Sequence, residues 1–214
     1  MLVVSTNIGE TVTVEWRDQK VQTGIFKFEV DEPICLGYED VFNDHVFDRR
    51  YHGGIDKACY LYSAAHYPFW QNKFPHLDWK WGMFGENITV ADLDESEIRI
   101  GDQFKIGDAL VQVTQPRQPC FKLGIRFGNQ AVVEDFWNLP FPGVYLRVLK
   151  SGNVKKGDEF ILVERNHESL SVSEVFSIFT RNRRNSKLIQ KALRETYLAN
   201  SCRKDIQKIY DAFN

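Results

Sequence analysis

Gln115-Pro116-Arg117-Gln118-Pro119-Cys120 ends an apolar, alternating run that begins at Ala109. Each proline fixes its own φ angle, lacks an amide hydrogen for a ladder bond, and biases the residue before it towards an extended conformation. We therefore expect a β-strand to stop at these prolines and Cys120 to lie on a stiff, non-helical segment at the strand end. A stiff segment suits a side chain that must hold one position, such as a metal ligand or a nucleophile.

The charge next to this thiol supports a chemical role. Arg117 lies three residues before Cys120 and carries a permanent positive charge, which favours the thiolate over the thiol. A second interpretation is a small core side chain, because free cysteine is among the most buried residue types. Local features alone leave both interpretations open.

Length and composition fit one compact domain, or one domain with a modest appendage. The chain has 214 residues, 43% of them hydrophobic, and a formal net charge of −2, which gives no global signal for nucleic acid or an anionic membrane. Its four cysteines lie far apart without a CxxC pair, which argues against a zinc ribbon, an iron–sulfur cluster or a disulfide scaffold. Residues 1–10 lack the basic and apolar regions of a signal peptide, and no apolar run approaches membrane-spanning length. We expect a cytoplasmic protein.

The first part of the chain has the texture of a β protein. Short alternating runs are separated by the pairs Gly101-Asp102, Gly107-Asp108 and Gly157-Asp158, which predict turns between strands. Many short strands joined by tight turns indicate a mainly β fold, and we expect a β-barrel with a few helices over residues 1–165. One helix is predicted after Ser63, which can cap it, with Pro68 in its first turns. The expected strands are Thr11–Trp16, Val21–Phe28, Ile98–Ile100, Phe104–Ile106, Ala109–Thr114, Val144–Leu149 and Glu159–Val163.

Residues 166–214 have a helical texture, and we expect a small C-terminal three-helix domain. Ser171 and Glu174 form a capping box in front of apolar residues at helical spacing. Ser186 and Ser201 are the expected caps of the second and third helices. The basic cluster Arg181, Arg183 and Arg184 falls in the polar break between the first two helices, where a solvent-facing loop is the simplest interpretation.

Two further segments carry polar residues among glycines. In 51–58, Gly53 and Gly54 let the backbone approach a ligand, and His52, Asp56 and Lys57 supply a base, an acceptor and a cation. In 82–89, glycines bracket a Glu-Asn pair at positions 86 and 87. Each segment also fits an ordinary loop, and neither identifies a chemistry alone.

In chain order, these segments and the cysteine segment resemble the MOSC family. The motifs are His-Gly-Gly-x-Asp-Lys-Ala, Phe-Gly-Glu-Asn-Ile-Thr-Val, Ile-Gly-Asp-x-Phe-x-Ile-Gly and Gln-Pro-Arg-x-Pro-Cys. The similarity is strongest to its stand-alone bacterial branch, which acts on N-hydroxylated purine-type bases and has a helical tail. One departure is Asn43-Asp44, where relatives carry Gly-Asp. Asp44 and Asp48 keep the acidic residues, but the local turn loses its glycine.

The resemblance implies that the barrel binds a molybdenum cofactor, a molybdopterin, with Cys120 as the protein ligand to the metal. A polarisable thiolate near Arg117 suits that metal. For the cofactor's phosphate, the expected partners are Lys57, Arg117 and Lys27, with Arg147 as a further candidate. The amides of Gly53 and Gly54, with Asn87 and Glu86, are expected at the pterin edge.

The activity implied by the resemblance is reduction of a small N-hydroxylated compound from N–OH to N–H. His52 is the expected proton donor, because its ordinary pKa is near neutrality, and Asp56 is expected to orient it. A structural histidine in a glycine-rich loop fits the sequence equally well. Because the chain carries no flavin or iron–sulfur motif, electrons are expected from a separate flavoprotein reductase.

Two alternatives belong to other functional classes. Cys120 is also suited to carry a persulfide in a sulfur-transfer protein. A third interpretation is a binding module without catalysis.

Overall fold

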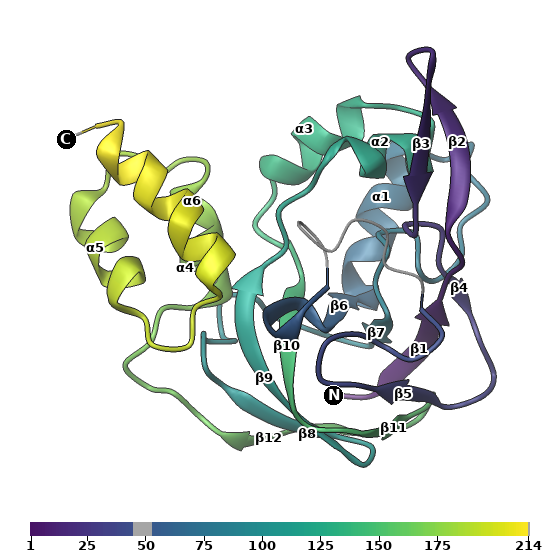
Figure 1. The fold of residues 1–214 in the computed structure, drawn as a ribbon, viewed down its shortest axis with the longest axis horizontal. Coiled ribbons are helices and arrows are strands. Elements are labelled where there is room, and N and C mark those ends of the chain that lie inside the picture. The colour runs from purple at the N-terminus through teal and green to yellow at the C-terminus, as the bar shows by residue number, and fades with distance from the viewer. Residues whose placement is uncertain (45–52, 214) are drawn as a thin grey trace.

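The structure is a computed structural model that describes residues 1–44 and 53–213 (Figure 1). Its strands are β1 Val3–Ile8, β2 Val12–Trp16, β3 Gln19–Thr23, β4 Phe28–Glu29, β5 Ile34–Leu36, β6 Cys59–Ser63, β7 Ile88–Val90, β8 Gln103–Ile106, β9 Ala109–Pro116, β10 Val144–Lys150, β11 Gly152–Val154 and β12 Phe160–Glu164. Its α-helices are α1 Tyr67–Lys73, α2 Phe121–Phe127, α3 Ala131–Trp137, α4 Val172–Ile178, α5 Ser186–Arg194 and α6 Asn200–Asp211. Two 3₁₀ turns are η1 Ile55–Lys57 and η2 Ala64–His66.

A large mixed sheet organises the described part of the chain. Its strand order is β12-β8-β9-β10-β6-β7-β1-β4, and the β6–β7 pair is parallel whereas the other pairs are antiparallel. The chain between the parallel strands passes through η2 and α1, which is the kind of long connection that parallel strands require. Two smaller sheets pair β11 with β5 and β2 with β3.

The expectation of a closed β-barrel is wrong, because the large sheet is open. Its two sides meet between Leu2, just before β1, and Glu159, just before β12, as an isolated bridge. Backbone hydrogen bonds such as Phe160 N to Met1 O at 2.8 Å and Val3 N to Asp158 O at 2.9 Å join the two sides there, but they do not extend into a paired strand. The chain turns at Gly157, whose φ is +88°, and the residues after Glu159 pair with β8.

The segment that ends β9 has the geometry predicted for it. β9 stops at Pro116, and Cys120 has an extended backbone with φ −131° and ψ 173°. α2 begins at the next residue. The prolines therefore separate a strand from a helix and leave Cys120 between the two.

Of the α-helices in the first part of the chain, only α1 was located from the sequence. The residues that the structure describes form six α-helices in all, and α2 and α3 were not predicted. Each has seven residues, too short to be stable alone. Both pack into a second, mainly aromatic core around Trp70 and Phe84, through Leu123, Phe127, Val132 and Phe136.

The tail contains the three expected helices, with one cap as predicted and two shifted. Ser171 and Glu174 form the predicted capping box at the start of α4. The cap of α5 is Asn185, whose side chain accepts a hydrogen bond from Leu188 N at 3.2 Å, in place of Ser186. α6 begins at Asn200, one residue before Ser201.

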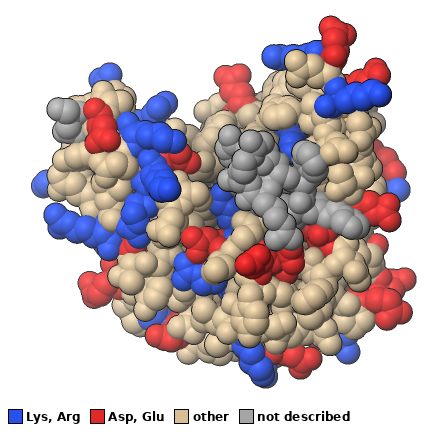
Figure 2. Space-filling view, viewed as in Figure 1, with Lys and Arg blue, Asp and Glu red and all other residues tan. Residues whose placement is uncertain are grey.

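The tail also forms the basic end of the molecule. Figure 1 shows α4, α5 and α6 gathered at one end and the β2–β3 hairpin at the other. Residues 166–214 hold nine Lys and Arg residues but only five Asp and Glu residues. In the whole chain the acidic residues are the more numerous, with 29 Asp and Glu against 27 Lys and Arg. Figure 2 shows the Lys and Arg side chains gathered on this lobe. Arg181, Arg183 and Arg184 are exposed to solvent there, as predicted.

One continuous apolar core links the sheet to the tail. It includes Val111 and Val113 of β9 together with Val175 of α4 and Ile206 of α6. The division at residues 165 and 166 stays a prediction. In the described ranges, no helix is both long and apolar enough to cross a membrane.

The assignment of Asn185 as the N-cap of α5 can be tested by mutation. Asn185→Ala is expected to lower the free energy of unfolding by about 1 kcal/mol, because Leu188 N loses its acceptor. Ser186→Ala, the matched control, is expected to change it by less than about 0.5 kcal/mol. Urea unfolding followed by circular dichroism measures both. A larger loss of stability for Ser186→Ala than for Asn185→Ala would show that Ser186 is the cap, as predicted from the sequence.

Candidate functional site

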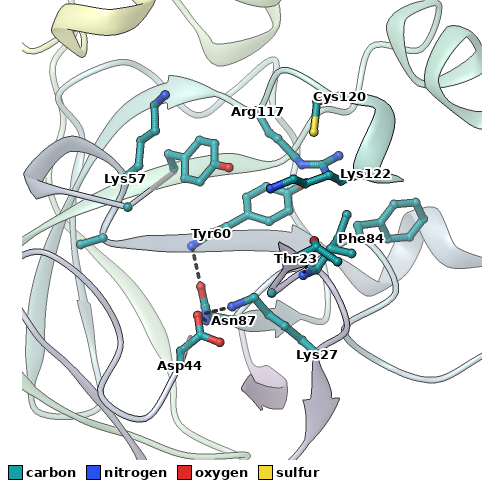
Figure 3. Close-up of a pocket in the computed structure, with 16 residues that line it drawn as sticks. Thr23, Lys27, Asp44, Lys57, Tyr60, Phe84, Asn87, Arg117, Cys120 and Lys122 are labelled. Carbon is teal, nitrogen blue, oxygen red and sulfur yellow. Dashed lines mark hydrogen bonds and ion pairs between the residues drawn. The ribbon is translucent and has the colours of Figure 1, made fainter. Parts of the chain in front are cut away.

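A pocket on the sheet collects several of the predicted site residues (Figure 3). It holds about 630 Å³ of space between the protein atoms, part of it open to solvent. Its walls come from the β3–β4 connection, η1, β6, the loop before β7, the β9–α2 connection and β10. The described lining residues are Thr23, Gly24, Ile25, Lys27, Asp44, Gly53, Lys57, Ala58, Tyr60, Phe84, Gly85, Asn87, Arg117, Cys120, Lys122 and Tyr145.

Cys120 is the cysteine of this pocket. Its side chain is half-buried and it directly precedes α2. Cys59 and Cys202 are buried, and burial raises the pKa of Cys202 to about 12 and that of Cys59 further, so both stay protonated thiols. Cys35 is half-buried, and its sulfur lies 3.9 Å from Ser151 Oγ. Of the four thiols, only Cys120 belongs to the described lining.

Arg117 brings a buried cation to the same pocket. Its guanidinium carbon lies 5.3 Å from the centre of the Tyr60 ring and 5.1 Å from that of Phe136, so aromatic faces support it. Although burial alone would lower it, the pKa of Arg117 is raised by electrostatic interactions with the neighbouring Tyr60, Tyr145 and Cys120. Its Nη1 atom is buried and has no hydrogen-bond partner among the described residues. A buried donor without a partner is unfavourable, and an anionic group or another hydrogen-bond acceptor in the pocket would satisfy it.

Two lysines add to this positive potential. Lys57 and Lys122 both line the pocket, and Figure 3 shows Lys57 and Cys120 on opposite sides of it. Burial lowers the pKa of Lys57, while Cys202, Asp205 and Asp56 act to raise it. Lys122 was not predicted, although its position two residues after Cys120 was an available signal.

Lys27 also lines the pocket, but its charge is already offset. Its Nζ forms an ion pair with the buried carboxylate of Asp44. Asp44 also accepts Asn87 Nδ2 at 2.9 Å and Gly9 N at 3.0 Å. Asn87 in turn accepts Tyr60 N at 3.2 Å, so its amide is engaged on both sides. This network fixes one wall of the pocket.

The turn before Asp44 forms although Asn43 stands at the position where the MOSC motif leads us to expect a glycine. Asn43 has φ +63°, in the left-handed region, which asparagine tolerates better than most residues. Asp44 N donates to Val41 O at 3.1 Å and completes the turn. Asp48 and His52 lie outside the described residues.

Glu86 lies outside the described lining of the pocket and has a structural role. It is fully buried, and burial raises its pKa, whereas its hydrogen bonds favour the ionised form. Gly82 N and Phe84 N each donate to it at 3.0 Å, Thr89 Oγ1 donates at 3.0 Å, and the Tyr67 hydroxyl donates as well. This carboxylate thereby orders the loop that carries Phe84 and Asn87.

Asp56, Arg147 and Gly54 also lie outside the described lining. The Asp56 carboxylate accepts hydrogen bonds from Arg147 Nε at 3.1 Å and from the Asn200 amide at 3.1 Å. Gly54 N donates to the carbonyl oxygen of Glu39 at 2.8 Å. These groups hold neighbouring segments together.

The sequence analysis did not identify the aromatic residues that form walls of the pocket, Tyr60, Phe84 and Tyr145. The rings of Tyr60 and Tyr145 are neighbours, with centres 5.2 Å apart and planes tilted by 41°, and Phe84 also lines the pocket. Burial raises the pKa of Tyr145, so its hydroxyl stays protonated near neutrality. Their positions in buried strands and loops look like ordinary core positions in the sequence, and only the fold brings them to the pocket.

Removing the Glu86 carboxylate should cost stability. Glu86→Ala leaves buried amide and hydroxyl donors without an acceptor, so we expect a loss of about 3 kcal/mol or more in the free energy of unfolding. Glu86→Gln keeps one acceptor oxygen and should lose less. Glu134→Ala, on the exposed face of α3, is the control. Equal losses for the two alanine variants would contradict the role given to Glu86.

The charge of Lys57 should make anion binding depend on pH. Because burial lowers its pKa, Lys57 loses its proton below the ordinary value of 10.5. The affinity for sulfate, whose own charge is constant in this range, should fall as the pH rises towards that value. Lys57→Arg should remove most of the fall, because arginine stays charged. Titration calorimetry from neutral to alkaline pH measures this, and a parallel decline in both proteins would rule out Lys57 as the cause.

Comparisons with known proteins agree with this architecture. The MOSC domain family matches residues 48–161. The YflK protein of Bacillus subtilis strain 168 is 38% identical over 98% of this chain and 94% of its own length. A Gibberella moniliformis protein named "Reductase" is 33% identical over 73% of this chain and 28% of its own length.

A solved structure extends the similarity to three dimensions. The crystal structure of YiiM from Geobacillus stearothermophilus superposes with a TM-score of 0.81 at 31% identity, covering 97% of this chain and 98% of that one. The sequence match and the shared fold cover both the sheet and the helical tail. The chain therefore belongs to the MOSC domain family.

Proposed function

We propose that this protein binds the molybdenum cofactor in the pocket and reduces N-hydroxylated compounds from N–OH to N–H. The observation that carries the proposal is the pairing of Cys120 with Arg117 in the lining of one cavity, where Arg117 Nη1 has no partner among the described residues. MOSC membership and the relative named as a reductase support an oxidoreductase.

The described lining fits such a cofactor in its chemistry. Cys120 offers one thiolate for the metal, and Arg117, Lys57 and Lys122 offer cations for a phosphate. Tyr60, Phe84 and Tyr145 form walls suited to a flat ring system. Gly53, with φ +75°, lets the backbone come close to a ligand. Lys27 contributes less net charge than predicted, because Asp44 offsets it.

When bound, the cofactor supplies the two-electron redox chemistry. The net reaction consumes the N–OH compound, two electrons and two protons, and yields the N–H compound and water. Arg117, Lys57 and Lys122 would hold the anionic part of the cofactor, and Cys120 would be the protein ligand to the metal. The protonated Tyr145 hydroxyl offers a hydrogen bond to an oxygen atom in the pocket.

The proton donor stays a proposal from the sequence. His52 keeps this role by residue type. Asp56 lies outside the described lining of the pocket, and its carboxylate bonds to Arg147 and to the Asn200 amide. We therefore give Asp56 a structural role. Electrons are proposed to come from a separate flavoprotein.

Cys120→Ala provides the central test. Produced in a host that makes molybdenum cofactor, the natural protein should contain molybdenum and reduce 6-hydroxylaminopurine with a chemical or flavoprotein donor. The variant should lose most of its metal and at least about a hundred-fold in rate, since it lacks the protein ligand. Elemental analysis and the ultraviolet–visible spectrum report the metal independently of turnover. Cys35→Ala is the matched control outside the pocket.

Other outcomes would favour other functions. Full metal content and rate in Cys120→Ala would refute the ligand assignment. A stable extra sulfur atom on Cys120 by mass spectrometry, without molybdenum, would favour a sulfur carrier. A loaded protein that is inactive with every reductant and N-hydroxylated compound would favour a binding module.

A further inference from the structure

The first turn of α6 is hydrogen-bonded to two segments that lead into the pocket, the end of β9 and η1. Ala199 N donates to the carbonyl oxygen of Thr114 at 3.1 Å, and Ser201 Oγ donates to Gln115 Oε1 at 3.2 Å. Both acceptors lie in β9, just before Arg117 and Cys120. The Asn200 amide donates to the Asp56 carboxylate at 3.1 Å, so the same turn also contacts η1.

Asp56 is the centre of these contacts. One carboxylate oxygen accepts Arg147 Nε at 3.1 Å, while Arg147 Nη1 also donates to Gln112 Oε1 at 3.0 Å. The carbonyl oxygen of Asp56 accepts the Thr114 hydroxyl at 2.6 Å. Asp56 is therefore bonded to β9, to β10 and to the tail helix.

Lys57 directly follows Asp56 in the short turn η1 and is the residue of that turn that faces the pocket. Its Nζ lies 5.9 Å from the centre of the Tyr145 ring. Because η1 has only three residues, a shift of Asp56 must move the backbone of Lys57 as well. Asp205 on α6 acts electrostatically on the Lys57 charge, which ties this side chain to the same helix.

We propose that Asp56 is a positioning residue through which α6 sets the position of Lys57, so that docking of α6 and anion binding in the pocket strengthen each other. Coupling of this kind is reciprocal: if docking favours binding, then binding must favour docking by the same factor. The identity of the anion rests on the proposed function, whereas the link between α6 and Lys57 does not.

Asn200→Pro tests this link without altering any side chain of the pocket. Asn200 is the first residue of α6, where proline is tolerated because that amide makes no bond within the helix. The preceding Ala199 has φ −53° and ψ 136°, which suits a residue before proline. The variant thus deletes the amide that donates to Asp56. Asn200→Ala keeps that amide and serves as the matched control.

The first readout needs no cofactor. Hydrogen exchange of peptides covering residues 53–58 should be faster in Asn200→Pro by about ten-fold, the worth of one hydrogen bond to a charged group. The rate at which acetic anhydride labels Lys57, followed by mass spectrometry, should differ between this variant and the natural protein. The rate for Lys122 should be the same in both. Asn200→Ala should match the natural protein in both measurements. If Asn200→Pro also matches it, the proposal is overturned.

The second readout uses the loaded protein. Molybdenum should be lost on dialysis about ten times faster from Asn200→Pro than from Asn200→Ala. Conversely, the cofactor should slow exchange within α6 in the natural protein. Equal loss rates, or no change in α6 on loading, would refute the coupling. A natural protein that never contains molybdenum would refute the proposed function, while the cofactor-free measurements would still decide the role of Asp56.

A second variant covers the case in which Asn200→Pro unfolds α6, which circular dichroism would reveal. Asp56→Asn keeps the shape of the side chain but weakens its bonds to Arg147 and Asn200. It should reproduce the faster exchange in residues 53–58, whereas Asp211→Asn, at the exposed end of α6, should not. Identical behaviour of these two variants would likewise overturn the proposal.

Discussion

A buried guanidinium with an unpaired nitrogen carries a free-energy cost, and the pocket is built around it. Arg117 is 5% exposed and is supported by the faces of Tyr60 and Phe136. Aromatic faces stabilise its charge but provide no acceptor for Nη1. A buried donor of this kind is usually satisfied by a partner or a ligand. An anionic group bound in the pocket would satisfy this donor, which is why the proposed function starts from Arg117.

Two neighbouring cations differ from Arg117, because each of them forms an ion pair with a carboxylate. Lys27 is paired with Asp44, and Arg147 is paired with Asp56. Both pairs fix backbone segments, because their carboxylates also accept amide or side-chain hydrogen bonds from other elements. Among the described residues, no ion pair to a carboxylate is found for Arg117. Arg117 therefore contributes positive charge to the pocket without a carboxylate that offsets it.

The sequence predicted the parts of the site that depend on local chain geometry. The prolines around Arg117 predicted both the end of β9 and the extended backbone of Cys120. The capping box at Ser171 was recognisable for the same reason. Contacts between distant segments left no local signal: Tyr60 and Tyr145 reach the pocket only through strand pairing, and α2 and α3 depend on packing against aromatic residues. The open sheet could not be distinguished from a barrel, because closure depends on one pairing between the strands at its two sides.

The residues that the motifs suggested divide into two layers, and this division has a physical basis. Cys120, Arg117 and Lys57 line the cavity, whereas Glu86, Asp56 and Arg147 hold the segments on which the lining residues stand. A sequence motif can contain both kinds of residue. A lining side chain that is displaced by about 1 Å loses much of its effect, so the residues that hold it in place matter as well. Asp56 illustrates the point: it is adjacent to Lys57 in the chain, but its carboxylate bonds to Arg147 and to the first turn of α6. The helical tail is thus bonded to the support of the pocket, although it contributes no residue to the described lining.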